Sequence, residues 1–182
     1  MKKIFHFCIC FFLVTALCHG QPEAKQARTV IYGGIGLGLD YGGIGFKIEY
    51  LPVKHIGIFA GAGLNLDQIG YNGGLSWKIL PDKTSTPFVI VMYGYNAVLK
   101  VTSPFNGFPV VDKTYYGFTA GAGYDFHVGK KNNKVSLAIL VPFRSQEFED
   151  EYNTYKDAGY EFKPDISPVL VSIGFNIGGR GK

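Results

Sequence analysis

The chain has 182 residues, 47% of them hydrophobic and 18% charged, and a formal net charge of +4. This length fits a single domain. A charge this small, without a basic stripe, argues against a nucleic-acid partner. All three cysteines, Cys8, Cys10 and Cys18, lie in the first twenty residues, so the rest of the chain offers no disulfide, thiolate metal site or cysteine nucleophile.

The N-terminus is typical of a secretory signal peptide over residues 1–20. Lys2 and Lys3 are followed by an apolar run at 4–17 and then by small residues before Gln21. The run is too short to span a membrane comfortably as a helix. A lipid anchor on Cys18 is an alternative, although a large leucine precedes it where a small residue is expected. A short segment, 21–28, separates this peptide from the first predicted strand.

Eight stretches then alternate apolar side chains with glycine or polar ones, which is the period-two pattern of a β-strand. Glycine is frequent inside them, and the Ala-Gly-Ala-Gly sequence at 60–63 recurs at 120–123. Inner-face glycines relieve crowding in a small, strongly curved barrel. No apolar run after residue 21 has the length of a transmembrane helix, so only a closed barrel could cross a membrane. The predicted strands are 29–39, 43–50, 55–64, 69–80, 88–100, 114–127, 134–143 and 166–177.

The connections between the predicted strands differ in length at the two ends. Short connections follow the even-numbered strands, whereas the two longest, 101–113 and 144–165, follow odd-numbered ones. An up-and-down barrel places alternate connections at opposite ends, and short turns opposite long loops are typical of outer-membrane barrels. We therefore expect an all-β, eight-stranded antiparallel transmembrane barrel domain at 29–177, followed by a tail at 178–182.

Function depends on which face of the sheet points outward. If the apolar face points inward, the chain is a soluble periplasmic carrier of an apolar ligand. If it points outward, the polar set fills the lumen. The number of bulky apolar side chains favours the outward orientation, because an eight-stranded barrel is only just wide enough inside for side chains. A barrel of eight strands also leaves no aqueous channel, which argues against a general porin.

The last predicted strand adds a further feature. Residues 168–177 carry polar Ser172 and then Gly174, Phe175 and Ile177, in the manner of an assembly signal. With the strand count, the alternation and the loop asymmetry, the chain over 29–177 resembles the small eight-stranded outer-membrane β-barrel family, in the plan of OmpA transmembrane domains and OmpX. This resemblance implies the outer membrane of a Gram-negative bacterium, contact with outer-membrane lipid and lipopolysaccharide, and the barrel assembly machinery as a partner.

Two sets of residues follow from the outward orientation. Polar side chains on the inner face would form a structural network of paired charges, because buried charges need partners. Aromatic side chains near the two strand ends would form girdles at the two membrane interfaces. The expected lumen network is Lys47, Glu49, Lys78, Asp125 and Arg144, and the expected girdle is Tyr50, Trp77, Phe126, Phe175, Tyr71, Tyr116 and Phe143.

Other chemistry is weakly indicated. His55 and His127 lie near the short-turn end, but a metal site needs a third ligand that the sequence does not supply. No nucleophile motif, phosphate loop or zinc signature appears, so we expect no catalysis, cofactor or metal. An outer-membrane lipid-modifying enzyme is the less favoured alternative. The acidic, aromatic loop 144–165 is the candidate surface for a ligand, or for cation bridges to lipopolysaccharide phosphates.

Overall fold

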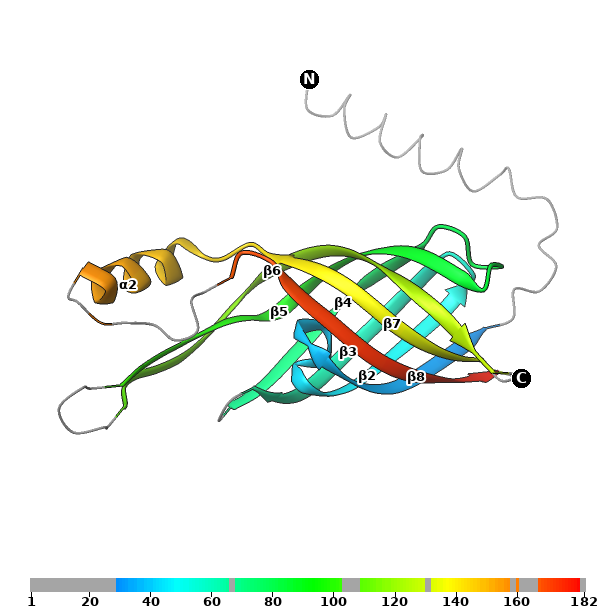
Figure 1. The fold of residues 1–182 in the computed structure, drawn as a ribbon, viewed down its shortest axis with the longest axis horizontal. Helices are drawn as coiled ribbons and strands as arrows, with labels where there is room; N and C mark the ends of the chain where they lie inside the picture. Colours follow the sequence, from blue (N-terminus) through cyan, green and yellow to red (C-terminus); the bar gives the residue numbers. More distant parts are fainter. Residues whose placement is uncertain are drawn as a thin grey trace, which may run out of the picture.

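The computed structural model describes residues 29–65, 68–102, 109–129, 132–157, 160 and 167–180. Eight strands pair with their neighbours in chain order, all antiparallel, and β8 pairs with β1 to close the barrel (Figure 1). The predicted eight-stranded up-and-down barrel is therefore confirmed, whereas the predicted signal peptide lies outside the described residues. The strands are β1 Val30–Gly38, β2 Gly43–Val53, β3 Ile56–Asn65, β4 Gln68–Lys78, β5 Ser85–Thr102, β6 Pro109–Val128, β7 Asn133–Pro142 and β8 Leu170–Arg180.

The closing strand differs in its limits from the sequence prediction. β8 begins at Leu170 and continues to Arg180, although the expected strand covered 166–177. Its last residues have partners, since Arg180 lies opposite Val30 at the start of β1. Pairing with β1 thus extends the strand through glycines that, taken alone, predict a tail.

Strands β5 and β6 are far longer than their neighbours. β4 pairs with β5 only as far as Gly94, and β7 pairs with β6 only as far as Thr119. The two strands nevertheless continue to pair with each other as far as Thr102 and Pro109. Residues 95–102 and 109–117, called the ribbon below, therefore project from the barrel as a two-stranded hairpin (Figure 1).

A helix that the sequence did not predict lies beside the ribbon. Helix α2, Gln146–Asp157, occupies part of the segment expected to be a loop (Figure 1). The hydroxyl of Ser145 accepts a hydrogen bond of 3.3 Å from the backbone N–H of Phe148, which caps the helix start. No helix among the described residues is long and apolar enough to cross a membrane.

The connection between β1 and β2 folds into the barrel. Its 3-10 turn η1, Leu39–Tyr41, is buried throughout, and the Tyr41 side chain has no exposed surface. Gly42 ends the turn in the left-handed region at φ 73°, which glycine adopts without strain. Gly174 on β8 leaves the space for the Tyr41 ring, since a Cβ there would lie 2.0 Å from the Tyr41 hydroxyl.

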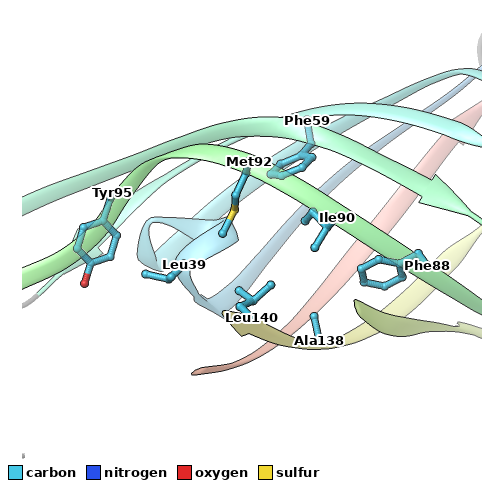
Figure 2. Packing of buried hydrophobic residues seen from close by; sticks show 8 residues of the cluster. All are labelled: Leu39, Phe59, Phe88, Ile90, Met92, Tyr95, Ala138 and Leu140. Carbon is cyan, nitrogen blue, oxygen red and sulfur yellow. The ribbon is translucent and has the colours of Figure 1, made fainter. Parts of the chain in front are cut away.

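An apolar cluster fills part of the lumen. Inward-facing side chains of β3, β5 and β7 meet Leu39 of the inserted turn (Figure 2). These side chains pack against one another as a small core inside the barrel. The buried members are Leu39, Phe59, Phe88, Ile90, Met92, Tyr95, Ala138 and Leu140.

Candidate functional site

The outer wall of the barrel carries the large apolar side chains. Along β2, for example, Ile44 and Phe46 are each 69% exposed, while Lys47 and Glu49 between the apolar positions are buried. The alternation seen in the sequence therefore has its apolar side outside. The alternative of a soluble carrier required the apolar face to point inward, and the exposure of these side chains contradicts that orientation.

The aromatic residues expected to form girdles are all exposed on this outer wall. Trp77 and Phe126 lie close to the ends of β4 and β6 that precede short turns, and Phe143 follows the end of β7 on the long-loop side. At that side the Tyr71 and Tyr116 rings contact each other with centroids 5.1 Å apart. Tyr50, Trp77, Phe126, Phe175, Tyr71, Tyr116 and Phe143 all have exposed fractions of 36% or more.

Four buried charges form a closed ring of ion pairs inside the barrel near the short turns. Lys78 Nζ lies 2.9 Å from Glu49 Oε1 and 2.8 Å from Asp125 Oδ2. Lys134 Nζ lies 2.6 Å from Glu49 Oε2 and 2.8 Å from the same Asp125 oxygen. Each carboxylate thus meets both ammonium groups, and the ring joins β2, β4, β6 and β7. Pairing of this kind is what allows charges to remain ionised when they are buried.

A second group of polar side chains surrounds the inserted turn η1. Asp40 forms a salt bridge with Lys47 on β2 and accepts a hydrogen bond from Ser172 on β8. The Lys47 ammonium also lies 4.2 Å from the centre of the Tyr41 ring. Tyr41 Oη in turn lies 3.0 Å from Asn176 Nδ2. Side chains of β2 and β8, the two strands that flank β1, therefore hold the turn in place.

Hydrogen bonds join the two groups into one network. Asn176 Nδ2 donates to Ser136 Oγ at 3.0 Å, and Ser136 Oγ donates to Asp125 Oδ1 at 2.6 Å. On the other side of the ring, Ser76 Oγ donates to Glu49 Oε1 at 2.6 Å. Ser136 occupies the Asp125 oxygen that the lysines leave open, and Ser76 adds a second donor to the Glu49 oxygen that Lys78 contacts. Further donors of this kind help to satisfy a buried polar network.

Arg144 was expected in this network, but the structure does not place it there. It follows β7 at the long-loop end, where its guanidinium donates to the Ser167 carbonyl oxygen and lies 5.5 Å from the centre of the Phe148 ring. If the alternation of β7 continued, the side chain at position 144 would point into the lumen, but the strand ends at Pro142. Beyond the end of a strand, alternation no longer determines which way a side chain points.

Two further charged members of the network, Lys134 and Asp40, were missing from the sequence prediction. Lys134 lies in a predicted strand, one residue before apolar Val135. Because neighbouring side chains in a strand point to opposite faces, an outward Val135 places Lys134 on the inner face, so the alternation could have identified it. Asp40 lies in a connection, where no periodicity applies. Only the inward fold of η1 brings it to Lys47.

The two histidines contact backbone carbonyl oxygens near the short turns. His55 Nδ1 lies 2.9 Å from the Lys78 carbonyl oxygen, and His127 Nδ1 lies 3.4 Å from the Thr84 carbonyl oxygen. No group of three or more acidic, histidine or cysteine side chains in the described part of the chain could hold a metal ion. A cavity of about 40 Å³ beside Lys78 and Lys134 has room for little more than water.

The chain matches no protein-family model and no curated protein sequence. Among solved structures it is similar to the N-terminal β-barrel domain of Pseudomonas aeruginosa OprF. The TM-score is 0.53 at 10% sequence identity, over 84% of this chain and 98% of that one. At this identity the similarity establishes the fold alone, an eight-stranded closed antiparallel barrel.

Proposed function

We propose that this protein is an integral outer-membrane β-barrel of a Gram-negative bacterium with a structural or surface-interaction role and without catalysis. The observation that carries the proposal is the apolar outer wall around a closed barrel. A closed barrel satisfies every strand hydrogen bond internally, and an outward apolar band is the surface that a bilayer covers. In water, so large an apolar surface would instead favour association.

The filled lumen supports a structural role over transport of solutes. The six charged residues buried in the described chain comprise three acids, Asp40, Glu49 and Asp125, and three lysines, Lys47, Lys78 and Lys134. Their charges cancel, and the inserted turn and the apolar cluster occupy the remaining interior. A balanced, packed interior gives a rigid wall with no aqueous passage.

Surface interaction is assigned to the ribbon together with α2. Phe148 of the helix packs edge-on against Tyr115 of the ribbon, with ring centroids 5.1 Å apart. Lys113 Nζ lies 2.8 Å from Glu147 Oε1 and 2.5 Å from Glu151 Oε1. These contacts fix the acidic helix on a rigid two-stranded support beyond the barrel, where a ligand or cation-bridged lipopolysaccharide phosphates would meet it.

The remaining partners follow from the same location. The exposed aromatic residues at the two strand ends would lie at the bilayer interfaces, because the amphipathic rings of tryptophan and tyrosine prefer the depth of the lipid headgroups. Outer-membrane lipid and lipopolysaccharide would surround the wall, and the barrel assembly machinery would insert the chain, with β8 as its recognised strand.

The proposal is tested by heat-modifiability of the full chain in fractionated membranes of the native or a Gram-negative host. We expect the protein in the outer-membrane fraction, extracted only by detergent, and migrating faster on a denaturing gel when unheated than when boiled. Extraction without detergent, together with identical migration before and after boiling, would overturn it.

A further inference from the structure

The seam at which β8 closes on β1 is formed by two glycine-rich strands. On its outer face, apolar side chains stand opposite apolar side chains or glycine, as Ile35 stands opposite Phe175. A shift of β8 by two residues would keep the same side chains outside and would place Ile173 or Ile177 opposite Ile35. Glycine-rich strands specify their register weakly, so the outer face alone does not decide how β8 pairs with β1.

The inner face of the seam is filled by a side chain that belongs to neither strand. Gly36 of β1 lies opposite Gly174 of β8, and the ring of Tyr41 occupies the space over both. An added Cβ would lie 2.7 Å from the ring at Gly36 and 2.0 Å from the hydroxyl at Gly174. The next inner positions of β8 on either side carry Ser172 and Asn176, and neither side chain would fit in the place of Gly174.

The inserted turn is attached to β2, β3 and β4 independently of β8. Asp40 pairs with Lys47 of β2, and Asn72 of β4 donates a hydrogen bond to the Leu39 carbonyl oxygen. On β3, Gly61 admits the turn backbone, since a Cβ there would lie 2.1 Å from the Asp40 carbonyl oxygen. All these contacts lie within residues 39–72, so none of them requires the last strand.

Three successive inner positions of β8 meet this turn in different ways. Ser172 donates a hydrogen bond to Asp40, Gly174 makes room for the Tyr41 ring, and Asn176 Nδ2 lies 3.0 Å from Tyr41 Oη. The four side chains that form these hydrogen bonds are each 3% exposed or less. The turn thus offers an acceptor, a bulky ring and a hydroxyl in an order that β8 matches in one register.

We propose that η1 is the template that selects the register in which β8 closes on β1. A shift by two residues would bring Ser172 or Asn176 to the position of Gly174, against the Tyr41 ring. Either shift would also take Ser172 away from Asp40. The proposal goes beyond the proposed function, because it concerns closure of the barrel and applies in detergent as well as in a membrane.

One other size-matched pair of the seam offers a rival explanation. Tyr32 of β1 is 7% exposed and lies opposite Gly178, where an added Cβ would lie 2.7 Å from the Tyr32 ring. Both Tyr32 and Tyr41 are buried and both face a glycine of β8, but only Tyr41 belongs to η1. Tyr32→Ala is therefore the matched control for Tyr41→Ala.

The test traps the register with disulfides in the full chain, folded from denaturant into detergent micelles and mildly oxidised. Residues directly opposite each other in antiparallel strands have Cα atoms about 4.5–5.5 Å apart, within the reach of a disulfide. Diagonal neighbours, about 7–8 Å apart, lie beyond that reach. The natural cysteines are first replaced by serine, so that only an introduced pair can form; they are Cys8, Cys10 and Cys18.

Three cysteine pairs report the register. Ile35→Cys is combined with Phe175→Cys for the observed register, and with Ile173→Cys or Ile177→Cys for the two shifted ones. All four positions are exposed on the outer wall, so the introduced cysteines leave the lumen contacts in place. In the parent we expect a disulfide only in the pair 35/175. Its yield is read from the mobility of the oxidised chain on a denaturing gel.

In Tyr41→Ala the disulfides of the shifted pairs should rise about tenfold above the parent background, the factor that one buried contact contributes to an equilibrium. Asp40→Ala/Tyr41→Ala should raise them further, whereas Tyr32→Ala should leave them at background. Heat-modifiable migration verifies that each variant has closed. If Tyr41→Ala does not close, Tyr41→Val, which keeps part of the side chain, takes its place.

Three outcomes would overturn the proposal. The first is a background yield of the shifted pairs in every closed variant of Tyr41, with or without Asp40→Ala. The second is an equal or larger rise in Tyr32→Ala, which would assign the register to that tyrosine. The third is a shifted disulfide in the parent, which would mean that the turn does not select one register.

Discussion

Lys134 on β7 and Glu49 on β2 are 85 residues apart in the chain, yet Lys134 Nζ lies 2.6 Å from Glu49 Oε2 across the lumen. Two strands, β1 and β8, separate β2 from β7 around the barrel. The pair therefore forms only when the barrel has closed, and the same two side chains also belong to the ring with Lys78 and Asp125. This relationship makes the lumen network a sensitive test of the closed state.

Lys134→Met should destabilise the barrel by about 3–5 kcal/mol, because it leaves one buried carboxylate of the ring uncompensated. The measurement is denaturant unfolding in detergent micelles, followed by the fluorescence of Trp77, the only tryptophan. The double variant Glu49→Gln/Lys134→Met, which restores charge balance, should lose less than the single variant. Lys54→Ala is the control: its ion pair with Asp82 is exposed and worth about 0–1 kcal/mol.

Gly174→Ala should destabilise the barrel by about 1–3 kcal/mol, the usual cost of overpacking. The added Cβ would lie 2.0 Å from the Tyr41 hydroxyl and would push the inserted turn out of place. In a Tyr41→Ala background the same change should cost less, which a double-mutant cycle measures. Gly33→Ala is the control, since a Cβ there meets nothing within 4 Å. An equal cost in both backgrounds would contradict the contact.

Ile48→Lys should impair membrane assembly, because its side chain is 62% exposed in the middle of β2 on the proposed lipid-facing wall. A lysine at the bilayer midplane costs about 2–4 kcal/mol in a barrel. The yield of heat-modifiable protein in the outer-membrane fraction measures the effect, with Ile48→Leu as control. Wild-type yield from Ile48→Lys would count against a lipid-facing wall.

The attachment of α2 to the ribbon should weaken at acidic pH. Hydrogen bonds from Lys113 and Tyr115 hold the pKa of Glu151 below its ordinary value of about 4.3. A carboxylate with a lowered pKa stabilises the folded state above its unfolded-state pKa, and this contribution is lost as the pH falls through the folded-state pKa. The attachment should therefore be intact at neutral pH and weaken only below about pH 4.

The NMR shifts of the Tyr115 ring, which packs against Phe148, report this attachment. Hydrogen bonds from Lys113 to Glu147 and Glu151 raise the pKa of Lys113, so the same contact should persist into alkaline solution beyond the ordinary lysine range. Glu151→Gln should show a weaker attachment at neutral pH and a reduced acid transition. An unchanged transition in this variant would assign the effect to another group.

The sequence predicts the barrel but only part of the polar network in its lumen. Period-two alternation placed Lys47, Glu49, Lys78 and Asp125 on one face, and the structure brings all four into the lumen. The same reasoning extended parity to Arg144, beyond the end of β7, where it no longer applies. It missed α2 because a helix of low apolar content resembles a polar loop until the ribbon supplies a surface for Phe148.

The sequence by itself determined the strand count, the antiparallel order and the two-faced wall, because alternation and turn composition are local properties of the chain. Only the tertiary structure decided that η1 enters the lumen, which ammonium group meets which carboxylate, and that Gly174 leaves the space for the Tyr41 ring. Gly33, where an added Cβ meets nothing within 4 Å, shows the limit: a glycine makes room for another side chain only through its neighbours on adjacent strands. Those neighbours are set by register and closure, which no local pattern encodes.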